Sequence, residues 1–307
     1  MTKIAFYDII TKIFWGVEMI SRQELQYVAS NAQGVPYPGD DYAYDVINRL
    51  SRAMVIFKQK YDGKKYSLIL SNGEEIIFEI KSKNLAHLLG IDFKGISTNT
   101  SLRPLLSKVL EINDPTQVNS YNVLSKIVEN GDKVIANDES SIHKLLNYYK
   151  IMIKTSCFDT LAEFNEFNFG IINFDKDIYE KTNTLGSRFY PASTKFIFTQ
   201  NDEALMPYCM MGLTYDNGTD LMIPETFIAP TNFCDYVYNQ ELLLPVQLLV
   251  NDEANLTKLV ATPEEKIRIL NLYKSIIETY NTGSYINIFN DYETILRDNV
   301  ASKKKIK

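Results

Sequence analysis

The chain has few of the side chains that build most metal centres, since its 307 residues include only two histidines and three cysteines. His87 and His143 stand far apart, and no His-Glu-x-x-His motif is present. Cys157, Cys209 and Cys234 form no Cys-x-x-Cys pair and have apolar or aromatic neighbours. The sequence therefore predicts no zinc site, no disulfide, and buried thiols in a reducing compartment such as the cytoplasm.

Long apolar runs are also missing. No stretch reaches the roughly 20 apolar residues of a membrane-spanning helix. Residues 4–20 come nearest, but Asp8, Lys12 and Glu18 interrupt them, and no small-residue cleavage site follows. We expect a packed amphipathic helix there, and a cytoplasmic protein without a membrane partner.

Glycine-rich phosphate-binding motifs are absent: the chain has no Gly-x-x-x-x-Gly-Lys and no Gly-x-Gly-x-x-Gly. We therefore expect no cofactor. Carboxylates are numerous but scattered, so they indicate no particular metal site. The net charge of −6 argues against broad, sequence-independent attraction to nucleic acid, although a small basic cleft is compatible with it.

The most informative stretch predicts a hairpin followed by a short helix. Residues 68–70 and 76–80 are rich in β-forming side chains, and Ser-Asn-Gly-Glu at 71–74 contains the Asn-Gly pair typical of tight hairpin turns. A helix capped by Ser82 and ended by Gly90 then places Leu85, Leu88 and Leu89 on one face. His87 lies roughly opposite those leucines and is predicted to point away from the core.

The remaining pattern predicts an α+β protein with an antiparallel sheet of about four to six strands and flanking helices. We expect a helical N-terminal region at residues 1–60, an α+β domain at 61–260, and C-terminal helices with a basic tail at 261–307. Further strands are predicted at 169–174, 195–198, 209–215, 221–223 and 246–250. Pro224 and Pro230 suggest an edge strand or a rigid loop between them. Thr262-Pro263-Glu264-Glu265 predicts a helix start.

Three segments in a fixed order carry a family resemblance: Asn-Leu-Ala-His-Leu-Leu-Gly-Ile at 84–91, Ile-Pro-Glu-Thr-Phe-Ile at 223–228, and Asp-Tyr-Val-Tyr-Asn-Gln-Glu at 235–241. Together they resemble the phage-associated branch of the Barnase–EndoU–Colicin–RelE-like nucleases. The resemblance covers roughly residues 64–250 and leaves both termini unexplained. It implies the antiparallel α+β fold of that family, and an activity that is itself inferred largely from fold.

The resemblance also implies site residues. His87 matches the family histidine, Thr226 the hydroxyl of the Pro-x-[Ser/Thr] strand, and Gln240 the late amide. We add Lys195, without a family counterpart, because a lysine on a strand could contact a phosphate. Metal-independent RNA cleavage needs a base, an acid and a donor for the phosphorane charge, and histidine suits the proton transfers because its ordinary pKa is about 6.5. The plainer interpretation is a surface histidine and an ordinary strand threonine.

Two hypotheses follow from the sequence. The first is a metal-independent ribonuclease or toxin-like effector, phage-encoded and acting on RNA in phage–host conflict. The second is a catalytically inactive binding protein on the same scaffold, such as an inhibitor of a host defence system, with a protein partner. The acidic net charge, the scarcity of basic residues near His87 and the lack of a second histidine in the matching strands motivate the second hypothesis.

Overall fold

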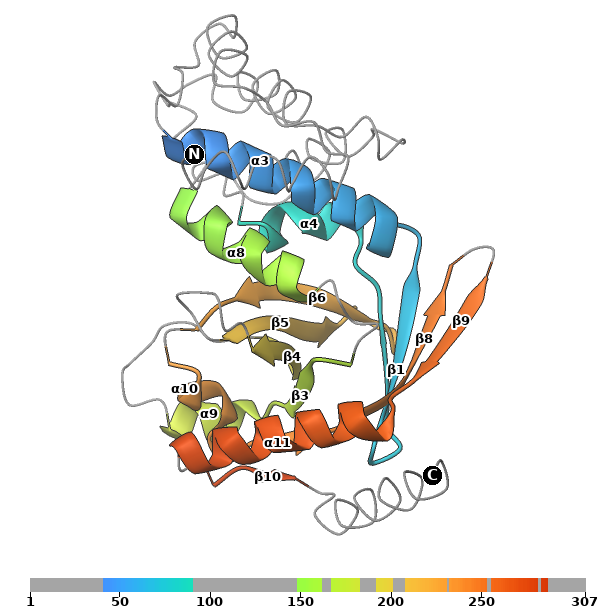
Figure 1. Ribbon diagram of the computed structural model, residues 1–307, viewed down its shortest axis with the longest axis vertical. Coiled ribbons are helices and arrows are strands. Elements are labelled where there is room, and N and C mark those ends of the chain that lie inside the picture. The colour runs from blue at the N-terminus through green and yellow to red at the C-terminus, as the bar shows by residue number, and fades with distance from the viewer. Residues whose placement is uncertain are drawn as a thin grey trace, which may run out of the picture. The chain divides into compact units, whose positions relative to one another are not determined.

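Figure 1 shows the computed structural model of the chain. The structure describes residues 41–90, 148–161, 167–182, 192–200, 208–230, 232–252, 255–280 and 283–286. The chain divides into two compact units, Met1–Asp62 with Lys81–Phe158 and Gly63–Ile80 with Asp159–Lys307. The helix predicted within residues 4–20 and the basic tail lie outside the described residues.

The first unit is helical where it is described. It contains α3 (Asp41–Ile56), the π-helical turn η1 (Phe57–Tyr61), α4 (Ser82–Leu88) and most of α8 (Tyr148–Leu161). In its core the rings of Tyr61 and Phe158 lie 5.4 Å apart. None of the described helices has the length and apolar character needed to cross a membrane.

Helix α4 confirms the predicted placement of His87. Leu85, Leu88 and Leu89 are buried, whereas His87 is exposed. Gly90 ends the helix with a φ of +79°, a left-handed conformation that glycine adopts without strain. The predicted N-cap is wrong by one residue: Lys81 occupies that position and makes no side-chain capping bond.

The second unit is built on one large sheet with flanking helices. Its strands are β1 (Lys65–Leu70), β2 (Glu75–Phe78), β3 (Gly170–Asn173), β4 (Lys195–Gln200), β5 (Tyr208–Tyr215), β6 (Met222–Ile228), β7 (Glu241–Leu243), β8 (Pro245–Asn251), β9 (Leu256–Val260) and β10 (Tyr285–Ile286). They are ordered β10-β7-β3-β4-β5-β6-β2-β1-β8-β9.

The α+β class is confirmed, but the prediction of a purely antiparallel sheet of four to six strands is wrong. Seven neighbouring strand pairs are antiparallel. Two pairs, β2 with β6 and β10 with β7, are parallel. Parallel neighbours need a long connection between them, which the local sequence pattern does not reveal.

The sheet curls because two strands near its opposite ends, β7 and β8, are joined through a single residue. Leu244 connects β7 directly to β8, yet β7 pairs with β3 and β8 pairs with β1, near opposite ends of the strand order. The Ser71 N–H donates to the Leu244 carbonyl at 2.9 Å and fastens the tip of the β1–β2 hairpin there. The curl thereby brings this tip close to β3 and β4, although β5 and β6 lie between β4 and β2 in the sheet.

Strand β6 is neither the edge strand nor the rigid loop that Pro224 and Pro230 suggested. It lies inside the sheet, between β5 and β2, and it includes Pro224. The register of β5 against β6 shifts between Gly212 and Leu213, and Leu213 is the partner of Pro224. Such a shift accommodates a residue that cannot donate a backbone hydrogen bond, so an interior strand tolerates proline here.

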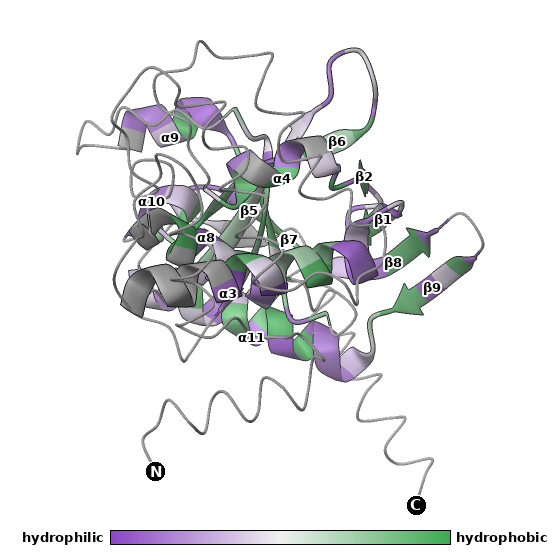
Figure 2. Ribbon diagram, turned by 90° about the horizontal axis from the view of Figure 1, so that it is seen from above, coloured by the Kyte–Doolittle hydropathy of each residue, from purple (hydrophilic) through white to green (hydrophobic). Residues whose placement is uncertain are grey.

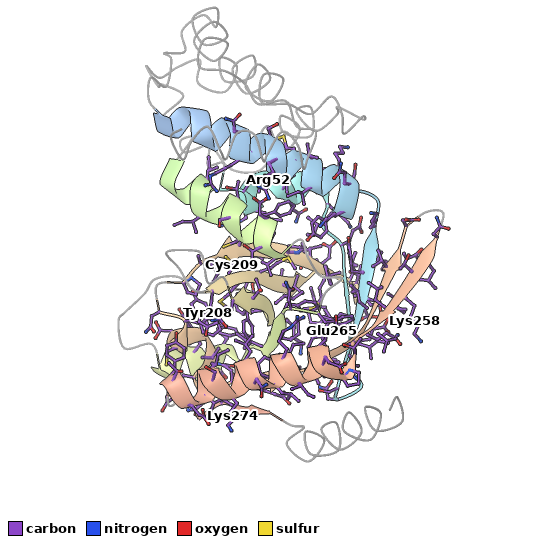
Figure 3. All side chains as sticks on the ribbon, in the orientation of Figure 1. Arg52, Tyr208, Cys209, Lys258, Glu265 and Lys274 are labelled. Atoms are coloured by element: carbon purple, nitrogen blue, oxygen red, sulfur yellow. The ribbon has the colours of Figure 1, made fainter. Side chains whose placement is uncertain are left out.

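The described part of the second unit contains α9 (Lys176–Thr182), α10 (Cys234–Val237) and α11 (Pro263–Tyr280). The predicted start of α11 is confirmed by a reciprocal capping box, in which the Thr262 N–H donates to Glu265 at 2.7 Å and the Glu265 N–H donates to the Thr262 hydroxyl at 3.2 Å. Glu265 lies in the first turn of this helix (Figure 3). Hydrophobic and hydrophilic residues alternate along α11 (Figure 2), and its buried stripe includes Ile269, Tyr273 and Ile276.

Aromatic side chains fix α10 and α11 against one face of β4. The ring of Phe196 lies 5.6 Å from that of Tyr236, and the ring of Phe198 lies 5.2 Å from Phe233 and 6.0 Å from Tyr273. Successive strand residues point to opposite faces of a sheet. Lys195, next to Phe196, therefore projects from the face opposite these helices.

The hydroxyl of Tyr273 also forms hydrogen bonds with two strands, β3 and β7. Its buried hydroxyl accepts a hydrogen bond from the Ile171 N–H at 2.9 Å and donates to the Leu243 carbonyl at 2.6 Å. Ile171 and Leu243 are register partners, so the hydroxyl stands between two strands where β7 leaves β3. Gly170 makes room for this ring, since a Cβ there would lie 2.5 Å from a Tyr273 ring carbon.

Buried tyrosines predict that the protein loses stability in alkaline solution. Burial raises the pKa of Tyr66, Tyr236 and Tyr273 above the ordinary value. As pH rises past about 10, the unfolded chain therefore loses protons that the folded chain keeps, and the free energy of unfolding falls. Urea unfolding between about pH 8 and pH 11 should show full stability at the lower end and a steep decline above about pH 10. A free energy of unfolding that stays level over this range would contradict the expectation.

Candidate functional site

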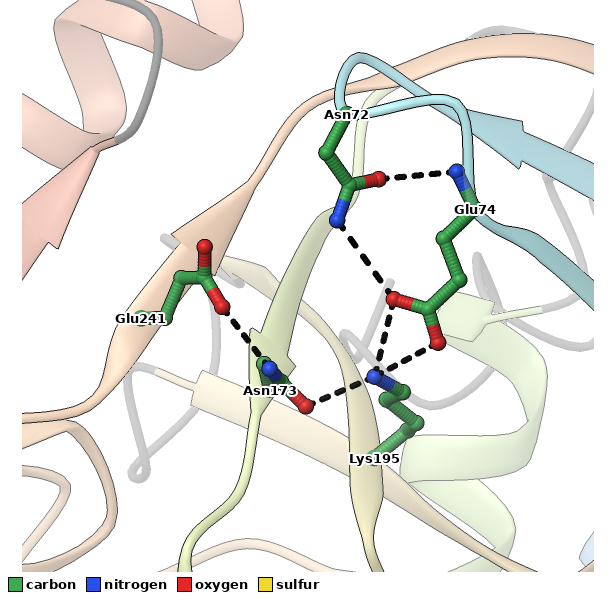
Figure 4. Close-up of polar contacts among 5 residues, drawn as sticks. All are labelled: Asn72, Glu74, Asn173, Lys195 and Glu241. Carbon is green, nitrogen blue, oxygen red and sulfur yellow. Dashed lines mark hydrogen bonds and ion pairs between the residues drawn. The ribbon is translucent and has the colours of Figure 1, made fainter.

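A row of polar side chains crosses three neighbouring strands on the face of the sheet that Lys195 occupies. Asn173 of β3 is the register partner of both Lys195 of β4 and Glu241 of β7, and direct cross-strand partners project on the same face. The Lys195 Nζ donates to the Asn173 Oδ1 at 2.6 Å, and the Asn173 Nδ2 donates to the Glu241 Oε2 at 2.7 Å (Figure 4). The amide of Asn173 thus joins the ammonium and the carboxylate.

Glu74 completes this network from the hairpin tip. Its Oε1 lies 2.8 Å from the Lys195 Nζ, and its backbone N–H donates to the Asn72 side chain at 3.0 Å. Only 7% of the Lys195 side chain is exposed, against 33% for Glu74. The charge of this buried lysine is therefore balanced by a carboxylate that the curl of the sheet brings to it.

Beside this row lies a polar pocket of about 480 Å³. It is lined by residues 173–178, 192–194 and 239–241, which end β3, begin α9, and precede β4 and β7. Among the described residues, its charged lining comprises Asp175, Asp177, Glu241 and Lys176, for a net charge of −2. The acidic excess of this described lining suits a cation better than a phosphate.

Gln240 fixes the wall of this pocket. Its side chain is 1% exposed, and its amide binds the backbone of Asp175 on both sides: Oε1 accepts from the Asp175 N–H at 2.6 Å, and Nε2 donates to the Asp175 carbonyl at 3.0 Å. The Asp175 Oδ1 in turn accepts from the backbone N–H groups of Asp177 at 2.8 Å and Ile178 at 3.2 Å. Gln240 thus holds the residue that caps α9.

The structure brings two of the four predicted site residues to this place. Gln240 lines the pocket, and Lys195 binds Asn173, which also lines it. Thr226 is buried on β6 and is not part of the described lining, although its neighbour Glu225 accepts a hydrogen bond from the lining residue Ser193 at 2.9 Å. His87 belongs to the first unit, and its exposed position on α4 is described above.

Sequence reasoning missed Asn173, Asp175, Glu241 and Glu74. The first two carried a readable signal, because both follow the apolar run Phe-Gly-Ile-Ile at 169–172, where polar groups at the end of a strand often form sites. Glu74 carried none, since it meets Lys195 across 121 residues of chain. Within the described residues, no group of three or more His, Cys, Asp and Glu side chains is arranged to hold a metal ion.

Comparison with protein-family models, with curated proteins and with solved structures gives no match to this chain. The function of the site is therefore inferred from its geometry.

Proposed function

We propose that this protein is a catalytically inactive binding protein whose acidic pocket takes up a positively charged group of its partner. The observation that carries the proposal is the acidic excess of the described pocket lining, which contains Asp175, Asp177 and Glu241 but only one lysine, Lys176, whose ammonium lies 3.7 Å from the Glu180 carboxylate. Such a site favours an arginine or lysine side chain of a protein partner, because a planar guanidinium can bond carboxylates through several N–H groups at once. The volume of about 480 Å³ lies within the usual range for a ligand site.

The same geometry speaks against the ribonuclease hypothesis. A phosphorane needs a cation or donors aimed at its developing charge. Lys195, the predicted cation, is buried and bound to Glu74 and Asn173, and both amide ends of Gln240 are bound to Asp175. Thr226 is not part of the described lining of the pocket, although its neighbour Glu225 accepts a hydrogen bond from the lining residue Ser193 at 2.9 Å. A binding protein agrees with these contacts. The sequence resemblance supports the proposal that it is an inactive relative of the phage-associated nucleases, such as an inhibitor of a host defence system.

Titration with two small probes tests the proposal. N-acetylarginine amide carries the guanidinium, and its citrulline counterpart has nearly the same shape without the charge. We expect the arginine probe to bind about tenfold more tightly, since hydrogen bonds to charged groups are stronger than neutral ones. Chemical-shift changes in residues 173–178 and 239–241 should report the binding.

A pair of variants locates the effect. Asp177 is exposed in the pocket lining, and no described residue forms an ion pair with its carboxylate. Asp177→Asn should therefore weaken arginine binding about two- to fivefold. Asp220→Asn, at an exposed turn position outside the pocket, is the matched control and should leave binding unchanged. Equal affinity for the arginine and citrulline probes would refute the proposal.

A further inference from the structure

The hairpin arm formed by β8 and β9 ends the sheet with an open edge. β9 is the last strand in the order, and among the described strands it pairs only with β8. Its five residues are mostly exposed, in contrast to the buried strands at the centre of the sheet. An edge strand of this kind presents unpaired backbone groups to any extended chain that approaches it.

Hydrogen bonds at both ends of the arm show which residues turn their backbone outward. The N–H of Ala261 donates to the Val246 carbonyl at 3.0 Å, and Asp252 and Asn255 exchange N–H···O bonds of 3.1 and 3.2 Å. In an antiparallel pair, hydrogen-bonded and non-hydrogen-bonded partners alternate. Counting inward from either end, Thr257 and Leu259 bond to β8, whereas residues 256, 258 and 260 direct their N–H and C=O groups to the open edge.

The side chains of those same three residues share one face. Leu256 is 67% and Val260 57% exposed, and the exposed Lys258 lies between them on β9 (Figure 3). β8 and β9 contain no acidic residue, so Lys258 is the one charged side chain of the two strands in a chain whose net charge is −6. The exposed Lys65 lies on the same face, because it pairs with Asn251, the partner of Leu256.

We propose that β9 receives an extended acidic segment of a partner protein as an added β-strand. Residues 256, 258 and 260 supply the backbone donors and acceptors for strand addition. An acidic side chain of the incoming strand lies opposite Lys258, and aliphatic side chains on either side of it cover Leu256 and Val260. A second copy of this chain is disfavoured, because antiparallel pairing centred on Lys258 sets two ammonium groups directly opposite each other.

This surface is independent of the acidic pocket and selects the opposite charge. The test uses the fluorescently labelled peptide Ac-Thr-Ile-Thr-Glu-Thr-Ile-Thr-NH2 and its Glu→Lys version, with the full chain and anisotropy as readout. We expect the glutamate peptide to bind about tenfold more tightly, since like and unlike charges directly opposite have opposite effects in a sheet. Lys258→Glu should reverse that preference, whereas Lys274→Glu, the same change on an exposed face of α11, should preserve it.

A proline variant tests the backbone part of the proposal. Lys258→Pro removes an N–H that points to the open edge, so the pairing with β8 stays intact and an edge strand tolerates the ring. For a peptide that carries neutral glutamine in place of glutamate, we expect this variant to lower the binding affinity about fivefold. The circular dichroism spectrum of the variant should be unchanged. The proposal is overturned if Lys258→Glu leaves the charge preference unchanged. It is also overturned if sedimentation shows a dimer of the full chain that Lys258→Pro dissociates, because the edge would then belong to a second copy.

Discussion

Glu74→Ala is expected to lower the free energy of unfolding by about 3–5 kcal/mol, the usual cost of removing one partner of a buried ion pair. Only 7% of the Lys195 side chain is exposed, so without Glu74 its ammonium remains buried with the Asn173 amide as its acceptor. The variant also removes a contact that fastens the hairpin tip to β4. Urea unfolding of the purified chain measures the loss.

Two further variants separate this effect from a general change in the hairpin. Glu75→Ala, at the exposed neighbouring position where the carboxylate accepts a hydrogen bond from the Ser67 hydroxyl, should change stability by no more than about 1 kcal/mol. Adding Lys195→Met to Glu74→Ala should recover most of the loss, because the unpaired charge is then removed. A loss below about 1 kcal/mol for Glu74→Ala would place Lys195 in a solvated, unconstrained position and contradict the network.

Tyr273→Phe is expected to lower the free energy of unfolding by about 2–4 kcal/mol, because it leaves a buried N–H and a buried C=O without the hydroxyl that binds both. Those groups belong to Ile171 and Leu243, at the point where β7 leaves β3. The aromatic packing against Phe198 is kept, so the loss reports the hydroxyl alone. Hydrogen exchange at the Ile171 amide should accelerate together with the loss of stability.

Tyr280→Phe is the matched control for this helix. Tyr280 lies at the last residue of α11, packs against Phe233, and makes no hydrogen bond through its hydroxyl to any described residue. Its replacement should leave stability within about 0.5 kcal/mol of the parent. If both variants had the same small effect, the strands would be held at that point without the Tyr273 hydroxyl.

Local structure was predictable wherever the signal is local. The Asn-Gly turn, the leucine stripe that turns His87 outward and the capping box at Thr262 all depend on residues within a few positions of one another. Their physical causes are turn geometry, helical spacing and end-group bonding, each of which can be read from a short window. The prediction of an edge at Pro224 failed because the register shift that accommodates this proline depends on β5.

The candidate site was predictable only in part. Lys195 was predicted from its chemistry and Gln240 from the family resemblance. Gln240 lines the pocket and Lys195 binds Asn173 beside it, but their partners could not be read from the sequence. Lys195 meets Glu74 because the sheet curls through Leu244, and Gln240 binds Asp175 across 65 residues of chain. Long-range closure of a sheet is set by strand order, which periodicity does not encode. These contacts indicate that Lys195 and Gln240 stabilise the shape of the site.

Incubation of the purified full chain with total RNA, with and without a chelator, tests the central proposal most directly. A binding protein with an acidic pocket should leave the RNA intact under both conditions. Cleavage that persists in chelator and disappears in His87→Ala would contradict it, because that exposed substitution should cost no more than about 0.5 kcal/mol of stability and its effect could not be ascribed to unfolding.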